Sequence, residues 1–242
     1  MIDKQGNTDL FSECVRDIDV AYKELGHTLG WRFLSVSKTV LERPAKIAFI
    51  TLNPGGDHEP PDHPRESCEN GVSYLVENWG ASPGQSTLQI QVQKMFSMIR
   101  NSINYDGTYQ QLMAESLISH FIPFRSPRFV DLTRKQESVE FSRRLWTRLL
   151  PAMSPRLIIC LGREVQTELR ALIPTAMSAV LEESQVFPTG WGNYTADIDR
   201  YSGPYGQVRL LFLPHLSTFK VFSSDKCRAQ MPMIIGEACR DL

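Results

Sequence analysis

Hydrophobic positions in this chain follow two kinds of pattern. Short runs of consecutive apolar residues closed by breaking residues are typical of buried parallel strands, and they span 46–52, 117–122, 156–162 and 208–213. Longer stretches carry apolar residues at helical spacing and predict helices over 9–27, 85–104, 136–150 and 163–172. A last helix is predicted to start near Ser223 or Ser224, each a plausible N-cap, and to be interrupted at Pro232.

Strands that alternate with helices imply a parallel sheet covered on both faces. We therefore predict a three-layer α/β/α sandwich with a short, mostly parallel central sheet. No linker, repeat or low-complexity tract divides the chain, which predicts one domain spanning 1–242. Ligands of such sheets bind at the carboxyl ends of the strands. The four loops that leave those ends begin at Asn53, Ile122, Gly162 and Pro214.

Composition narrows the class of protein. Hydrophobic residues make up 42% and charged residues 22% of the chain, and the net charge is −1. That charge gives no global support for a nucleic-acid partner, although a local basic face can coexist with it. The five scattered cysteines form no C-x-x-C pair, so neither a zinc ribbon nor a disulfide framework is expected. The polar N-terminus lacks a signal-peptide core and no apolar run reaches the roughly 20 residues of a membrane span. These features predict a soluble cytoplasmic protein with no membrane partner.

Two loops at predicted strand ends carry the candidate chemistry. Residues 52–56 (Leu-Asn-Pro-Gly-Gly) follow the first strand, and residues 213–220 (Leu-Pro-His-Leu-Ser-Thr-Phe-Lys) follow the last. Taken singly, the first is readable as a turn and the second as a structural histidine. Taken together and in this order, they resemble the two signature motifs of the uracil-DNA glycosylase superfamily.

Three further segments agree with that resemblance. Residues 71–74 (Gly-Val-Ser-Tyr) are similar to the element that supplies the aromatic floor of the base pocket. Residues 119–127 resemble the second-strand element that reads the base, and residues 155–162 resemble the third strand with its glycine. The resemblance covers residues 46–220. It implies a uracil-DNA glycosylase-like fold and a monofunctional, cofactor-free glycosylase that removes a damaged or deaminated, uracil-like base from DNA.

The resemblance assigns roles that fit the chemistry of base excision. Such an enzyme flips the nucleotide out of the stack, holds it in a pocket and stabilises the leaving anion. In the catalytic roles, Asn53 would orient water and His215 would donate to the pyrimidine O2. The implied base-binding residues are Leu52, Tyr74 and His120. The implied DNA-binding residues are Arg125, Ser217, Phe219 and Lys220, with Phe219 or Leu216 as a wedge and Lys220 and Arg125 on phosphates. No metal and no obligate protein partner are expected.

Departures from the family pattern leave alternatives open. Thr51 stands where the family has a small glycine, and His120 stands where it usually has an asparagine. The chain is therefore alternatively a catalytically silent protein of the same fold that binds nucleic acid or a nucleobase. It is also readable as an unrelated small-molecule α/β enzyme. The long polar loop over 57–70 is readable as a solvated loop or as a zinc site, whose ligands would be Asp57, His58, Asp62, His63 and Cys68.

Overall fold

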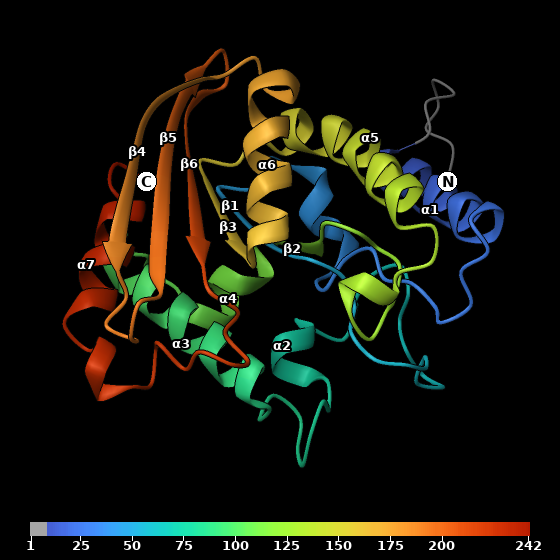
Figure 1. Ribbon diagram of the computed structural model, residues 1–242, viewed down its shortest axis with the longest axis horizontal. Coiled ribbons are helices and arrows are strands. Elements are labelled where there is room, and N and C mark those ends of the chain that lie inside the picture. Colours follow the sequence, from blue (N-terminus) through green and yellow to red (C-terminus); the bar gives the residue numbers. More distant parts are fainter. Residues whose placement is uncertain (1–8) are drawn as a thin grey trace.

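The computed structural model describes residues 9–242 (Figure 1). Residues 1–8 lie outside the described residues. They include most of the polar N-terminal segment from which the absence of a signal peptide is predicted. The described chain has a mixed α/β fold around one sheet with the strand order β2-β1-β3-β6-β5-β4, which confirms the predicted α/β class. The strands are β1 (Ile47–Thr51), β2 (Leu117–His120), β3 (Leu157–Leu161), β4 (Val180–Pro188), β5 (Thr195–Gly203) and β6 (Gly206–Leu213).

The four predicted strands form the parallel part of this sheet. Strand β1 pairs with β2 on one side and with β3 on the other, and β3 pairs with β6, all in parallel. Every residue of β1 and β3 is buried. Such strands read as continuous apolar runs because helices cover both of their faces.

Strands β4 and β5 extend the sheet as an antiparallel hairpin that pairs with β6. The apolar pattern does not predict them. The reason lies in β5, which places two carboxylates, Asp197 and Asp199, at buried positions. Arg163 donates to Asp197 at 2.8 Å, and Arg170 forms two hydrogen bonds to Asp199. Burial of a charge is tolerated when it is paired in this way, and it removes the hydrophobic signal of the strand.

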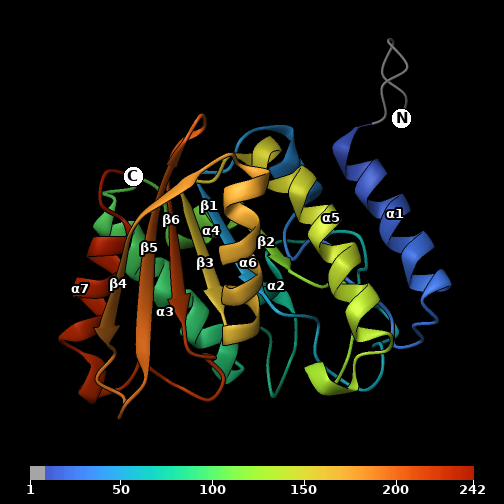
Figure 2. The same cartoon turned by 45° about the horizontal axis from the view of Figure 1, so that its top comes forward.

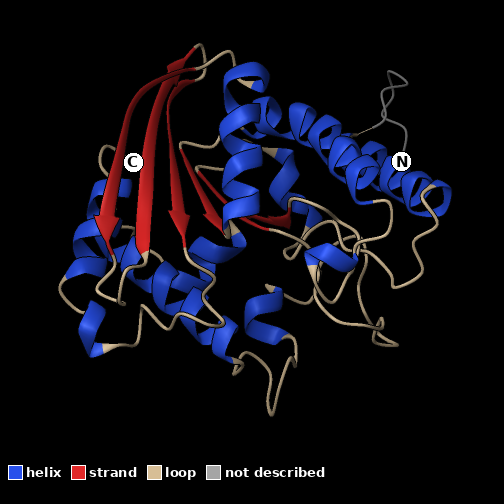
Figure 3. Ribbon diagram, in the orientation of Figure 1, coloured by secondary structure: helices blue, strands red, loops and turns tan. Residues whose placement is uncertain are grey.

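Helices cover both faces of the sheet (Figures 2 and 3). Helices α5 and α6 lie against one face and α3, α4 and α7 against the other, while α1 lies beside α5, to which Arg148 and Asp17 join it at 2.7 Å. Within residues 9–242, no helix is both long and apolar enough to cross a membrane. The helices are α1 (Leu10–Glu24), α2 (Ser73–Val76), α3 (Thr87–Ser102), α4 (Tyr109–Ala114), α5 (Lys135–Met153), α6 (Arg163–Ala176) and α7 (Gln230–Ala238).

Local capping explains where several helices begin. The Asp9 side chain accepts from the backbone N–H of Ser12 at 2.8 Å and caps α1. Ser86 and Gln89 form a reciprocal capping box at the start of α3. Gly162 has φ +92°, a value that L side chains rarely adopt, and it turns the chain from β3 directly into α6.

The last helix does not begin at the predicted residues, Ser223 or Ser224. Ser224 precedes a short 3-10 turn, Asp225–Cys227, and α7 begins only at Gln230. Pro232 does not interrupt this helix. It lies in the first turn, where a backbone N–H has no intrahelical partner and its loss is harmless.

Candidate functional site

The predicted site residues gather at the edge of the sheet where its parallel strands end. Strand β1 ends at Thr51 and Asn53 follows it; β2 ends at His120; and β6 ends two residues before His215. In the strand order β2-β1-β3-β6, only β3 separates β1 from β6. Adjacent strands lie about 4.8 Å apart, so the ends of β1 and β6 are about 10 Å apart. No hydrogen bond or ion pair of the described chain joins His215 to Asn53 or His120.

Asn53 is held by its amide nitrogen. Nδ2 donates to the carbonyl of Pro54 at 2.9 Å and to the carbonyl of Ser126 at 3.1 Å. Both partners are acceptors, so the orientation of the amide is fixed by the network. Both amide protons are used, and within residues 9–242 the side-chain oxygen Oδ1 makes no hydrogen bond. The site therefore presents a carbonyl acceptor from this residue.

The neighbouring loop holds the Asn-Pro-Gly segment in place. The backbone N–H of Ser126 donates to Pro54 at 3.1 Å, and the N–H of Ile122 donates to the carbonyl of Leu52 at 2.8 Å. Arg125 donates from Nη1 to the carbonyl of Gly55 and contacts His63 from Nη2 at 2.7 Å. Its residue exposure is only 8%. Arg125 thus stabilises this loop. Its contact with a DNA phosphate stays a prediction, and the low exposure of the side chain argues against it.

His120 and Tyr74 meet at Thr51. The register pairs Thr51 with His120 across β1 and β2, and Thr51 Oγ1 lies 2.7 Å from His120 Nδ1. A hydrogen bond from Thr51 also counteracts the rise that burial causes in the pKa of Tyr74. Burial, reinforced by nearby Arg32 and Arg125, lowers the pKa of His120 to about 3, so the imidazole is neutral.

Tyr74 lies deeper than a base-stacking residue would. Its exposure is 1%, and its ring packs edge-on against Phe49 and Trp79, with centroids 5.6 and 4.9 Å away. The predicted stacking role therefore requires Trp79, which is 40% exposed, to move aside.

A buried basic cluster lies beside His120 and is missing from the sequence-based site. Arg32 donates to Glu77 at 2.6 Å and faces both ring nitrogens of His63 at 3.3 Å. Burial and the three arginines around it lower the pKa of His63 to about 3. His63 therefore lies against two guanidinium groups, whose positive charge opposes the binding of a cation at this ring. Among the described residues, no three His, Cys, Asp or Glu side chains are grouped to hold an ion.

The His215 loop is ordered by its own hydrogen bonds. His215 Nδ1 lies 2.8 Å from Ser217 Oγ, and the N–H groups of Thr218 and Phe219 donate to the His215 carbonyl. The Phe219 ring packs on Tyr194, with centroids 4.0 Å apart, whereas Lys220 is exposed. Leu216 is fully buried and is thereby unsuited to the wedge role.

The pKa of His215 is lowered by burial, and the Glu164 carboxylate opposes this shift. Removing that negative charge withdraws its stabilisation of the imidazolium, so Glu164→Gln should lower the pKa of His215 further. An NMR titration of the imidazole would measure this. Glu168→Gln, one helical turn along α6 and paired with Arg143, is the matched control and should leave the titration of His215 unchanged.

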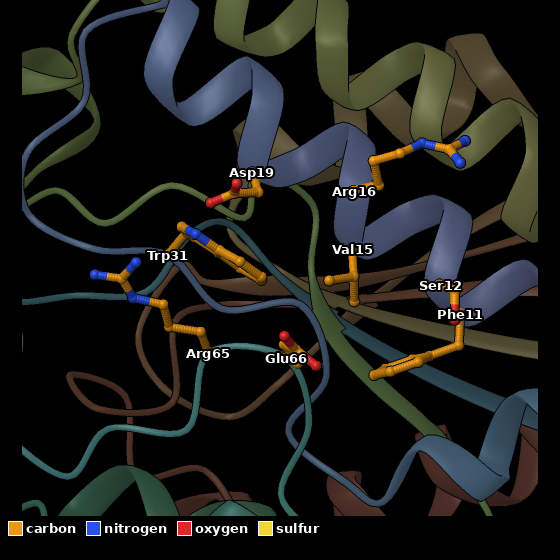
Figure 4. A pocket seen from close by; sticks show the side chains of 8 residues that line it. All are labelled: Phe11, Ser12, Val15, Arg16, Asp19, Trp31, Arg65 and Glu66. Carbon is orange, nitrogen blue, oxygen red and sulfur yellow. The ribbon is translucent and has the colours of Figure 1, made fainter. Parts of the chain in front are cut away.

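A cleft of about 440 Å³ lies elsewhere, between α1 and the segments around Trp31 and Arg65 (Figure 4). None of the sequence-predicted site residues lines it. Its lining is Phe11, Ser12, Val15, Arg16, Asp19, Trp31, Arg65 and Glu66.

Neither a protein-family model nor a curated protein matches the sequence.

Proposed function

We propose that this protein is a DNA glycosylase of the uracil-DNA glycosylase type, which hydrolyses the N-glycosidic bond of a damaged or deaminated base. The observation that carries the proposal is the fixed amide of Asn53. Two backbone carbonyls hold its nitrogen, which leaves Oδ1 to accept a hydrogen bond from an attacking water. The position of the two motifs, after β1 and after the last strand β6, supports the same assignment.

The chemistry needs groups at both ends of the breaking bond. As the bond from C1′ to the base nitrogen breaks, its electron pair stays with the base and the sugar becomes cationic. The water held by Asn53 adds its oxygen to C1′, and its proton is released. His215 lies at the other side of β3, where a donor can stabilise the anionic base, and its own Nδ1 is engaged by Ser217.

The proposal is tested by incubating the purified protein with oligonucleotides that carry uracil, hypoxanthine, xanthine or a thymine mismatch. Alkali then cleaves the abasic sites. We expect strand cleavage at one or more of these bases and much less with Asn53→Ala. Absence of cleavage at all of them would reject the enzyme.

One observation favours a second candidate, a catalytically silent protein of this fold that binds nucleic acid or a nucleobase. Tyr74, which would form the floor of a base pocket, is covered by Trp79. Binding of the same oligonucleotides without cleavage would select this candidate over the enzyme.

DNA binding is expected to involve Lys220. A lysine that neutralises one phosphate contributes about one unit to the slope of log K against log salt, so Lys220→Ala should weaken binding to all sequences and reduce that slope by about 1. Filter binding or anisotropy at several salt concentrations would measure it. Lys46→Ala is the matched control, because Lys46 is equally exposed but precedes β1, at the opposite edge of the sheet. An equal effect of the two variants would reject phosphate contact by this loop.

A further inference from the structure

The turn over 189–194, between β4 and β5, lies beside the His215 loop. Strand β5 pairs antiparallel with both β4 and β6, so this turn emerges at the edge of the sheet where β6 ends. The ring centroid of Phe219 is 4.0 Å from that of Tyr194 and 6.4 Å from that of Trp191. Tyr194 is 48% exposed, and the other two are partly exposed. These three residues, the aromatic platform, thus present ring surface to solvent close to His215.

The aromatic platform is held by a tightly bonded turn. The N–H of Tyr194 donates to the carbonyl of Trp191 at 3.1 Å, and the hydroxyl of Thr189 donates to the carbonyl of Tyr194 at 2.7 Å. Gly190 has φ +84°, and a Cβ there would collide with the backbone carbonyl of Lys226, so the turn packs closely on the segment after β6. A surface that is ordered before binding loses little conformational entropy when a partner binds.

Basic side chains lie on the segment after β6, on which the turn packs. Lys220 and Lys226 belong to this segment, and Lys94 of α3 joins it by donating to Ser223 Oγ at 2.9 Å. All three lysines are exposed, and none forms a salt bridge with a described residue. The single aspartate of the segment is paired with Arg228. The surroundings of the aromatic platform are therefore locally positive, although the net charge of the chain is −1.

The same contacts leave the His215 loop without a free wedge. Leu216 is fully buried, and Phe219 is packed on Tyr194. Proteins that unstack a duplex frequently insert an apolar side chain between its bases. An unpaired strand needs no wedge, because its bases are free to stack on an aromatic ring. Aromatic side chains beside a positive surface are the common means of binding single-stranded DNA.

We propose that the aromatic platform and the lysines beside it bind an unpaired base of single-stranded DNA, next to the base that enters the site. This inference rests on the proposed function for its partner. Tyr194 supplies the stacking surface, and Phe219 supports that ring instead of entering a duplex. Because stacking tolerates any base, the platform holds the strand and leaves the choice of the damaged base to the site at Asn53 and His215.

The platform is tested without catalysis, by anisotropy of a labelled single-stranded oligothymidylate that carries no damaged base. Tyr194→Ala should weaken its binding about 5- to 100-fold, the scale of one base–aromatic stack, without changing the salt slope. Tyr194→Phe keeps the ring and should bind like the wild type. Tyr205→Ala is the matched control, because Tyr205 is also 48% exposed but lies in the β5–β6 turn, at the opposite edge of the sheet. Unchanged binding by Tyr194→Ala overturns the proposal.

A strand of the same length whose sugars carry no bases separates stacking from phosphate contacts. The wild type should bind this abasic strand more weakly than oligothymidylate, and Tyr194→Ala should bind it as tightly as the wild type does. An equal loss on both strands would overturn the stacking role. Phe219→Ala should weaken the binding of oligothymidylate, whereas a wedge would act on duplexes alone. A loss confined to duplex DNA therefore also overturns the proposal.

The platform and the glycosylase fail in different ways. If no damaged base is released but Tyr194→Ala weakens the binding of oligothymidylate, the glycosylase is rejected and the platform is supported. If a damaged base is released but Tyr194→Ala binds like the wild type, the glycosylase is supported and the platform is rejected. Tighter binding of an undamaged duplex than of the single strand also rejects the platform.

Discussion

Replacing His215 with alanine is expected to slow base release by about 100-fold or more, the scale of losing one preorganised donor to the leaving group. His215 is exposed in the free protein, and the partial desolvation of its ring lowers its pKa from the ordinary value, which favours the neutral imidazole that donates without placing a full charge beside the bound base. Because negative charge develops on the base only as the bond breaks, the donor acts more strongly in the transition state than in the ground state. Single-turnover cleavage of a damaged oligonucleotide would measure the loss.

The binding of that oligonucleotide should change much less than the rate. Ser217→Ala is an informative companion, because it removes the hydroxyl that lies 2.8 Å from His215 Nδ1 but leaves the imidazole in place. It should cause a smaller loss than His215→Ala. Wild-type cleavage by His215→Ala with intact DNA binding would mean that the loop after β6 is not the catalytic one.

The parallel part of the sheet could be predicted from the sequence for a physical reason. Strands β1 and β3 are buried at every position, so their sequences must be continuous apolar runs. Pro and Gly residues then mark the loops that leave their ends, which is why Asn53 and His215 could be assigned to one edge before the strand order was known.

The rest of the fold depends on contacts between distant residues. The sequence of β5 does not indicate a buried strand, because two of its buried residues, Asp197 and Asp199, are carboxylates. Their charges are neutralised by arginines of α6, a helix that precedes β5 in the sequence. The start of α7 differs from the sequence-based prediction for a related reason. Ser224 carries the local signal of a cap but serves a short turn, and only packing decides where the longer helix begins.

In the candidate site, too, some residues could be predicted from local sequence and others depend on contacts between distant residues. The strand-end motifs indicated Asn53, His120 and His215, but Arg32 lies in an irregular segment with no periodic signal, and its partners Glu77 and His63 are 45 and 31 residues away. The residue types of the 57–70 loop also made His63 a candidate metal ligand. The fold instead places two arginines against it, and this changes its chemistry from metal ligand to neutral acceptor.

Acidification below pH 6.5 is expected to destabilise this protein steeply. Burial lowers the pKa of His27 to about 4, and burial together with neighbouring arginines lowers the pKa values of His63 and His120 to about 3. An unfolded chain titrates its histidines near 6.5. Between these values the unfolded state binds protons that the folded state does not, so stability is complete above pH 6.5 and is lost as the pH falls toward the folded values.

The size of this effect follows from the number of histidines. Each contributes up to about 1.4 kcal/mol per pH unit, so three together set an upper limit of about 4 kcal/mol per pH unit. Domains are typically stable by about 5–15 kcal/mol, and a fall of two pH units is enough to remove much of that. Denaturant unfolding at pH 7.5, 6.5 and 5.5 would measure the slope.

Substitution of single histidines separates this explanation from general acid sensitivity. His27 is buried, with Nε2 3.0 Å from Ser138 Oγ, and His27→Gln should reduce the average slope between pH 6.5 and 5.5 by about 1 kcal/mol per pH unit, less than the limit because an unfolded histidine is only half protonated at pH 6.5. His58→Gln is the matched control, because the His58 side chain is 80% exposed beside Asp57 and should leave the slope as it is. Carboxylates titrate mainly below this window, so a free energy of unfolding that stays constant from pH 7.5 to 5.5 would contradict the burial of three neutral histidines.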